Sequence, residues 1–273
     1  MQATLEAIVA QNRALTARGK VATYIPELAM GDANAIGICL IDGAGNIHLA
    51  GDTDIRFTLQ SVSKVFALML ALEDQGFAGV FDRIGMEPTG DAFNSIVKLE
   101  TFASLRPLNP LINAGAIATT ALIKGDSVAE RFQRLYSYIE TIAGSERIGF
   151  NERVYRSEKA TGDRNRAIGY FLRDIEAITG DVEEVLDPPL TRDTLRVVRT
   201  FMYTCGMYDA TGEFAVKVGI PAKSGVSGAI MAIAPNRQMG IGVIAPALDE
   251  KGNSKAGVQV LADLSRELGL SVF

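Results

Sequence analysis

The chain has 273 residues, of which 48% are hydrophobic and 22% are charged, with a formal net charge of −5. That length can bury a sizeable core, in one large domain or two small ones. The acidic balance and the absence of Lys/Arg runs exclude a basic nucleic-acid-binding surface, and no apolar run is long enough to span a bilayer.

The N-terminal 19 residues predict an amphipathic helix and not a signal peptide, because charged residues interrupt the apolar pattern. The apolar positions at helical spacing are Leu5, Ile8, Val9 and Leu15. Residues 34–52, NAIGICLIDGAGNIHLAGD, then read as two strands joined by a tight Asp-Gly-Ala-Gly turn.

From about residue 62 to 206 the pattern is mainly helical. Predicted helices cover VSKVFALMLALEDQG, which ends at Gly76, then NAGAIATTALI, VAERFQRLYSYIETIAG and TGDRNRAIGYFLRDIEAITG, which closes at Gly180. The small residues of NAGAIATTALI suit a closely packed buried helix.

The C-terminal part predicts strands again. KSGVSGAIMAIAPN and QMGIGVIAPAL are Ile-rich runs separated by a turn and are expected to pair. The last helix places Val258, Leu261, Leu264 and Leu268 on one stripe. We therefore expect a single α/β (α+β) domain over residues 1–273, with an antiparallel sheet flanked by terminal helices (1–60 and 207–273) and a helical insertion (61–206).

The cysteine and histidine content limits the chemistry. Cys39 and Cys205 lie far apart without a CxxC pair, which favours a reducing, cytoplasmic setting. His48 is the single histidine, which excludes a metal site with several histidine ligands. It also argues against a Ser-His-Asp catalytic triad. We expect His48 to be structural or exposed.

Ser61 and Lys64 form the first motif that could carry chemistry. A serine hydroxyl becomes a good nucleophile when a neighbouring group takes its proton, and residues three apart on a helix share a face. Lysine serves as that base when burial lowers its pKa. The alternative is a helix cap at Ser61 and a solvated Lys64, and Ser95 and Lys98 show the same spacing.

Lys223-Ser224-Gly225 precedes a predicted strand, as a Lys-Ser/Thr-Gly triplet does in Ser-x-x-Lys acyl transferases, although alone it is an ordinary turn. The S-x-N or Y-x-N signature of β-lactamases and penicillin-binding proteins is absent from the sequence. Tyr208 is a candidate proton relay, because a phenol near cations can have a lowered pKa. The alternative is a half-buried tyrosine whose hydroxyl bonds to the backbone.

The chain resembles the serine-dependent glutaminases in motifs that run in family order across nearly its whole length. These are YIPELA, QSVSK, NPLINAGAI, SEKATGDRNRAIGY, TCGMYDATGEFA, GIPAKSGVSGAI and PALDEKGNS. The resemblance implies a serine β-lactamase-like fold and hydrolysis of L-glutamine to L-glutamate and ammonia. It implies no metal or organic cofactor, no nucleic-acid or membrane partner, and a homodimer or homotetramer.

The resemblance also implies roles for individual residues. Ser61 matches the nucleophile, Lys64 its base and Tyr208 the second proton-transfer group, with the N–H groups of Ser61 and Val226 as the oxyanion hole. Tyr24, Asn113, Glu158 and Asn165 match the positions that hold the amino-acid end of the substrate. Glu158 suits an α-ammonium, and the amides and phenol suit an α-carboxylate. Without the resemblance, a helix cap and a solvated acid would explain Glu158 and Asn165.

One stretch departs from the family. Pro189 stands where the family has a substrate-contacting tyrosine, and a helical segment is missing between about residue 187 and TCGMYD. Two alternatives to a glutaminase therefore stay open. One is a family relative whose catalysis is impaired by the missing segment. The other is a different Ser-x-x-Lys amide or ester hydrolase on the same scaffold.

Overall fold

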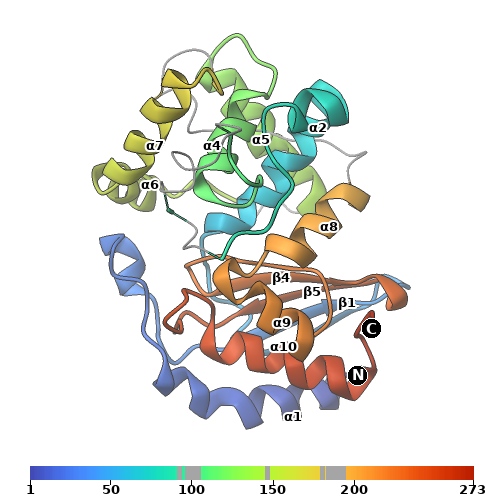
Figure 1. The fold of residues 1–273 in the computed structure, drawn as a ribbon. Helices are drawn as coiled ribbons and strands as arrows, with labels where there is room; N and C mark the ends of the chain where they lie inside the picture. The colour runs from blue at the N-terminus through green and yellow to red at the C-terminus, as the bar shows by residue number, and fades with distance from the viewer. Residues whose placement is uncertain (91–93, 96–105, 145–147, 179–181, 183–194) are drawn as a thin grey trace. The chain divides into compact units, whose positions relative to one another are not determined.

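The computed structural model describes residues 1–90, 94–95, 106–144, 148–178, 182 and 195–273 (Figure 1). These residues form two compact units. The sheet unit comprises Met1–Val62, Arg153–Glu158 and Met202–Phe273, and the helical unit comprises Ser63–Glu152 and Lys159–Phe201.

Five antiparallel strands form the sheet, in the order β2-β1-β5-β4-β3. They are β1 Gly37–Ile41, β2 Ile47–Gly51, β3 Ala222–Ser224, β4 Ala229–Ala234 and β5 Met239–Ile244. The two ends of the chain meet at the β1–β5 pair, where Ile38 lies opposite Val243. The expected antiparallel sheet is confirmed. The run from Lys223 is divided, because a turn at 225–228 with Gly228 at φ 89° separates β3 from β4.

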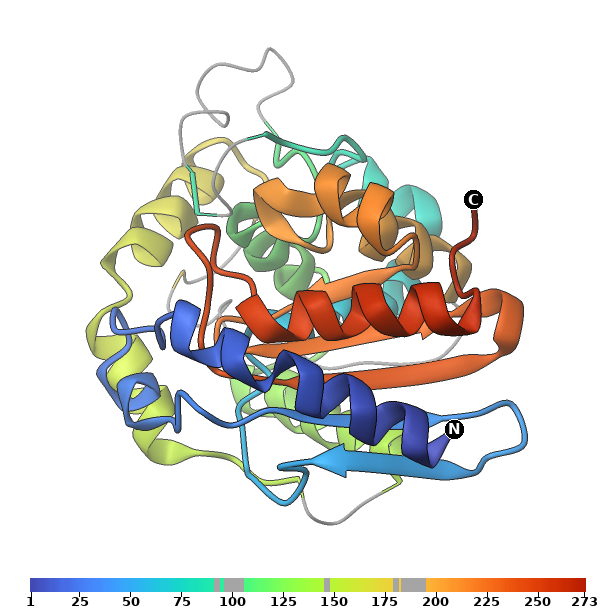
Figure 2. The ribbon, with the colours of Figure 1, turned by 90° about the horizontal axis from the view of Figure 1, so that it is seen from below.

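Two terminal helices cover one face of this sheet. Helices α1 Gln2–Asn12 and α10 Lys255–Leu268 lie side by side across it (Figure 2). Alternate strand residues point to this face. The core there includes Leu5, Ile38, Leu40, Ile241, Val243, Val260, Leu261 and Leu264. Val258 and Leu268, which the stripe predicted as core, are only partly buried, because the buried face of α10 includes Val260.

The β1–β2 turn forms as the sequence predicts. The Asp42 carboxylate accepts hydrogen bonds from the N–H groups of Ala44 and Asn46, both at 2.9 Å. Gly45 has φ 84°, a left-handed conformation that favours glycine. His48, on β2, lies 3.4 Å from Asp42, in a structural position.

The helical unit is built around a short helix of small residues. Its helices are α2 Ser63–Phe81, α4 Asn113–Ala121, α5 Val128–Ala143 and α7 Asp163–Asp174. Helix α4 contacts both α2 and α7. A Cβ at Gly115 would lie 1.8 Å from the Asn109 carbonyl oxygen, so only glycine fits this position. Helices α6 Glu152–Ala160 and α8 Leu195–Cys205 contribute residues to both units.

Two predicted helix ends can be compared with the structure. Gly76 interrupts α2 with φ 70° and ψ 175°, so the helix breaks where its end was predicted, although this ψ is not that of a left-handed C-cap. The helix predicted to close at Gly180 ends at Asp174 instead, because Glu176 adopts φ 59° and the Ala177 N–H bonds to the Leu172 carbonyl oxygen.

The shortened stretch at 187–190 and Gly180 lie outside the described residues. Within the part of the chain that the structure describes, no helix has the length and apolar character needed to cross a membrane.

A buried polar contact joins the terminal helices. Asn12 Nδ2 donates to Asp263 Oδ2 at 2.8 Å, and both residues are buried. Burial opposes ionisation of Asp263, but hydrogen bonds from Asn12, Gln259 and Arg266 outweigh it and lower the pKa of Asp263. The folded state therefore favours the carboxylate, and this stabilisation is lost as the pH falls through the pKa of the folded state.

Asp263→Ala is expected to lower the free energy of unfolding at pH 7 by about 2 kcal/mol, because the buried Asn12 amide loses one of its two acceptors and keeps only the Ile8 carbonyl oxygen. The difference from wild type should shrink as the pH falls below about 4, where the reference carboxyl protonates. Urea titrations across that pH range measure it, with the exposed Asp163→Ala as the control. A difference that is independent of pH would contradict the assignment.

Candidate active site

Ser61 lies in the short 3-10 turn η3 Gln60–Val62, directly before α2. The preceding residue, Gln60, has φ 47°, a left-handed conformation that costs a non-glycine residue about 1–3 kcal/mol. The end of β3 packs closely on this turn, since a Cβ at Gly225 would lie 2.7 Å from the Leu59 carbonyl oxygen. The backbone that carries Ser61 is therefore fixed by the edge of the sheet.

Tyr208 is brought to Ser61 within the sheet unit. Its hydroxyl hydrogen-bonds with the Ser61 side chain and donates to the Ser224 carbonyl oxygen at 3.0 Å. Lys223, which is fully buried, donates from Nζ to the same carbonyl oxygen at 2.6 Å. The Lys223 Nζ also lies 4.4 Å from the centroid of the Tyr208 ring.

Burial determines the charge state of Tyr208. It raises the pKa of Tyr208, and hydrogen bonding with Ser61 lowers it by less. The expected lowered pKa is therefore wrong, because desolvation of the phenolate outweighs the hydrogen bonds with Ser61 and Ser224. A neutral phenol can donate to the Ser224 carbonyl oxygen and accept from the Ser61 hydroxyl. The backbone contact that the structural alternative predicted is also present.

Two more expected residues belong to the same unit. Glu158 lies near the end of α6 and accepts from Gln60 Nε2 at 3.4 Å. Tyr24 precedes the 3-10 turn η2 Pro26–Met30 and has 54% of its surface exposed. Although more than half of this residue is exposed, partial desolvation of its hydroxyl, together with the negative charge of Glu158, raises the pKa of Tyr24. The Glu158 carboxylate therefore faces the Gln60 amide and the Tyr24 hydroxyl.

In the helical unit the remaining side chains form a chain of hydrogen bonds. Lys64 Nζ donates to Asn113 Oδ1 at 2.6 Å and to the Leu111 carbonyl oxygen at 3.4 Å. Asn113 Nδ2 in turn donates to Asn165 Oδ1 at 2.8 Å. Lys64 is partly buried and hydrogen-bonded, which contradicts the alternative of a solvated lysine.

The start of α4 explains why this chain of hydrogen bonds forms. The fully buried Asn109 accepts from the Leu111 and Ile112 N–H groups at 3.0 and 3.3 Å, and donates to the Glu87 carbonyl oxygen. This turn sets the direction of the helix, so that Asn113 stands at its first position.

Val226 supplies a backbone group instead of a side chain. It is buried in the turn between β3 and β4, which the Gly225 and Gly228 N–H groups close by bonding to Ala229 and Gly225. No acceptor for the Val226 N–H lies among the described residues. The N–H is therefore available to a developing negative charge.

Gln60 was not identified from the sequence. Its left-handed backbone and its contact with Glu158 link the serine turn to the acid. Its position directly before Ser61 was a signal, but glutamine has no preference for this conformation. Among the described residues, no three His, Cys, Asp or Glu side chains gather as a metal site would require.

Comparisons with known proteins agree on one family. The sequence profile described as Glutaminase matches residues 19–189 and 188–273. A glutaminase from Alkaliphilus oremlandii is 48% identical over 306 positions, covering all of both chains. Because this chain has 273 residues, at least 33 of those 306 positions have no counterpart in it.

Solved structures are similar to the whole chain. One is the covalent complex of the Bacillus subtilis glutaminase YbgJ with 5-oxo-L-norleucine, formed with 6-diazo-5-oxo-L-norleucine. It is 34% identical with a TM-score of 0.87, covering 100% of this chain and 99% of that one. Another is Mglu in its glutamate form, 35% identical with a TM-score of 0.92, covering 100% of this chain and 69% of that one.

The raised pKa of Tyr208 predicts that its phenol stays protonated beyond the ordinary value of about 10. Near-ultraviolet titrations of phenolate absorbance should therefore coincide below about pH 10 for wild type and Tyr208→Phe. The same shift should make the folded state lose stability as the pH rises above about 10, where unfolded tyrosine ionises. An ionisation below that pH, present in wild type and absent in Tyr208→Phe, would contradict the neutral phenol.

Proposed function

The chain belongs to the glutaminase family and hydrolyses L-glutamine to L-glutamate and ammonia, and we propose that Ser61 is its nucleophile. The fold is the serine β-lactamase-like one of the bacterial glutaminases that it matches. The observation that carries the proposal is the hydrogen bond between the Ser61 and Tyr208 side chains at the edge of the sheet. Lys64, three residues further along, supplies the second polar group.

The proposed reaction has two halves. The Ser61 oxygen attacks the side-chain amide carbon of glutamine, and Lys64 in its amine form takes the serine proton. The N–H groups of Ser61 and Val226 stabilise the oxyanion. When the C–N bond breaks, neutral Tyr208 protonates the leaving nitrogen, and the proton held by Lys64 restores the phenol. Water then hydrolyses the ester to glutamate and returns a proton to Ser61.

The four remaining residues are proposed to hold the amino-acid end of glutamine. Glu158 pairs with the α-ammonium, which is supported by its carboxylate and by its contact with Gln60, the residue directly before Ser61. Asn113, Asn165 and Tyr24 donate to the α-carboxylate. Mglu, a similar structure, is described in its glutamate form, which is consistent with a site for this end group.

Three wider statements are also proposals. The whole chain acts as one glutaminase domain, which is supported by relatives that align over their full length. A cytoplasmic setting is supported by two free cysteines, Cys39 and Cys205. A homodimer or homotetramer rests on the family resemblance alone.

A second candidate function has its own support. The family profile matches in two parts that meet at residues 188–189, and the relative from Alkaliphilus oremlandii has at least 33 more positions among 306 than the 273 residues here. A segment missing at this junction would remove part of the substrate pocket. The alternative is a relative that folds and binds glutamine without releasing ammonia.

Ser61→Ala is expected to reduce ammonia release from L-glutamine by at least about 10³-fold, since the acyl-enzyme cannot form. The matched control is Ser63→Ala, two residues away, which should stay close to wild type. A folded but inactive wild type would favour the impaired relative, and a Ser61→Ala variant as active as wild type would show that the nucleophile is wrongly assigned.

Glu158→Gln is expected to lower kcat/KM for glutamine about 10- to 100-fold, the effect of losing a hydrogen bond to a charged group. A simple ester without an α-ammonium should be hydrolysed equally by both proteins. Glu152→Gln, on the exposed start of α6, is the control. Equal losses on both substrates would contradict the ammonium contact, and activity on esters alone would favour the other hydrolase.

A further inference from the structure

The turn that carries Tyr208 is under backbone strain. Tyr208 has φ 55°, a left-handed conformation that glycine adopts freely and tyrosine does not. It begins the 3-10 turn η4 Tyr208–Ala210, which runs into α9 Thr211–Lys217. Such a conformation persists only where neighbouring groups fix the peptide planes on both sides.

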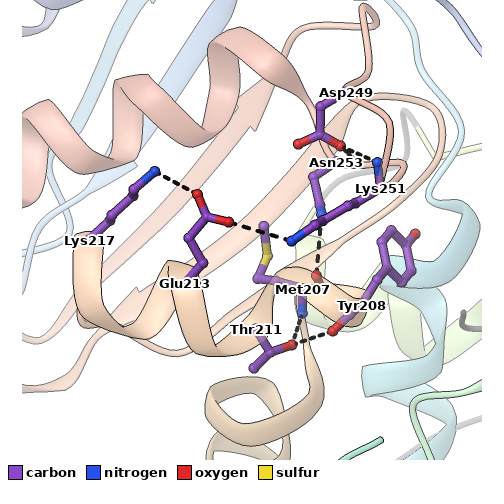
Figure 3. A network of polar contacts seen from close by, with 8 residues as sticks. All are labelled: Met207, Tyr208, Thr211, Glu213, Lys217, Asp249, Lys251 and Asn253. Carbon is purple, nitrogen blue, oxygen red and sulfur yellow. Dashed lines mark hydrogen bonds and ion pairs between the residues drawn. The ribbon is translucent and has the colours of Figure 1, made fainter. Parts of the chain in front are cut away.

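Thr211 fixes the turn from one side. Its hydroxyl accepts from the Met207 N–H at 3.1 Å and donates to the Tyr208 carbonyl oxygen at 2.7 Å. One hydroxyl group therefore holds peptide groups on both sides of the Met207–Tyr208 bond. Figure 3 shows Thr211 beneath this turn, with the Tyr208 ring pointing away from the contact.

Asn253 fixes the turn from the other side. Its side chain is fully buried, and Nδ2 donates to the Met207 carbonyl oxygen at 3.2 Å. Its Oδ1 meets no donor among the described residues. Among those residues, the side-chain amide of Asn253 therefore bonds only the Met207 carbonyl oxygen. The Asp249 carboxylate holds the loop by accepting from the Lys251 and Asn253 N–H groups at 2.9 and 3.0 Å.

We propose that Thr211 and Asn253 are positioning residues, which hold the strained Met207–Tyr208 turn so that the phenol faces Ser61. The proposal rests on the proposed role of Tyr208 in proton transfer. Neither residue needs to touch the substrate, because each acts through the backbone of the turn. Misplacing a reacting group by about 1 Å can cost up to about 100-fold in rate.

The same loop supplies a matched control. Lys251 Nζ lies 3.5 Å from Glu213, and Glu213 pairs with Lys217 at 2.6 Å (Figure 3). The Lys251–Glu213 pair also connects the loop to α9, but both pairs are exposed and contact neither Met207 nor Tyr208. Exposed pairs contribute little to stability. Lys251→Ala thus loosens the loop without removing the contacts of the turn.

The variants to compare are Thr211→Val, which removes the hydroxyl at nearly constant size, Thr211→Ser, which keeps it, Asn253→Ala and Lys251→Ala. We expect Thr211→Val and Asn253→Ala to lower kcat about 10- to 100-fold, with KM within about 2-fold. Thr211→Ser and Lys251→Ala should stay within about 2-fold of wild type. Thermal melts and labelling with 6-diazo-5-oxo-L-norleucine give the fraction of folded, reactive protein.

A double variant separates positioning from general stability. If Thr211 acts through Tyr208, adding Thr211→Val to Tyr208→Phe should cause no further loss of kcat. Further loss in the double variant, or loss of activity fully accounted for by unfolded protein, would overturn the proposal. So would wild-type kcat in folded Thr211→Val and Asn253→Ala.

Tyr208→Phe alone distinguishes the two proposals. If it is as active as wild type, the assignment of Tyr208 itself fails. If it is impaired while Asn253→Ala and Thr211→Val are not, only the positioning role fails.

Discussion

Lys223 is fully buried, and its Nζ donates to the Ser224 carbonyl oxygen and lies 4.4 Å from the centroid of the Tyr208 ring. A buried polar group is costly unless neighbouring groups compensate it, so these contacts fix the geometry around Lys223. The Ser224 carbonyl oxygen also accepts from the Tyr208 hydroxyl. Because Ser224 pairs with Ile230 on β4, the register of the sheet determines where the phenol stands.

The serine side of the site depends on the same sheet edge. Gln60 directly precedes Ser61, and Tyr208 is the hydrogen-bond partner of Ser61. Both Gln60 and Tyr208 have left-handed backbones. Each left-handed backbone costs conformational free energy, and folding does not require two of them at one pair of side chains. Gly225 against the Leu59 carbonyl oxygen, and Thr211 and Asn253 around the Tyr208 turn, hold these conformations.

Much of the fold could be predicted from the sequence because its signals are local. Alternation and turn residues identified the β1–β2 hairpin, and periodicity identified α2, α4, α5 and α10. The end of α7 was misplaced, since nothing in the sequence indicates that Glu176 takes the left-handed position instead of a glycine. The separate strand β3 was hidden within one continuous apolar run, although the turn that divides it from β4 contains Gly225 and Gly228.

The site was only partly predictable. Spacing suggested Ser61 and Lys64, and motif resemblance supplied Asn113, Glu158 and Asn165, whose contacts depend on distant segments. The pKa of Tyr208 was predicted in the wrong direction, because burial is a property of the packed sheet and not of neighbouring residues in the chain. Gln60 and Asn253 act through backbone geometry, which sequence spacing does not express.

The most direct test of the account is to find which residue becomes covalently modified. The protein is incubated with 6-diazo-5-oxo-L-norleucine, the compound that forms the covalent complex of the similar YbgJ structure, and its peptides are mapped by mass spectrometry. The account predicts one adduct, on Ser61, that is absent from Ser61→Ala. An adduct on another residue, or an unmodified protein that is folded, would contradict it.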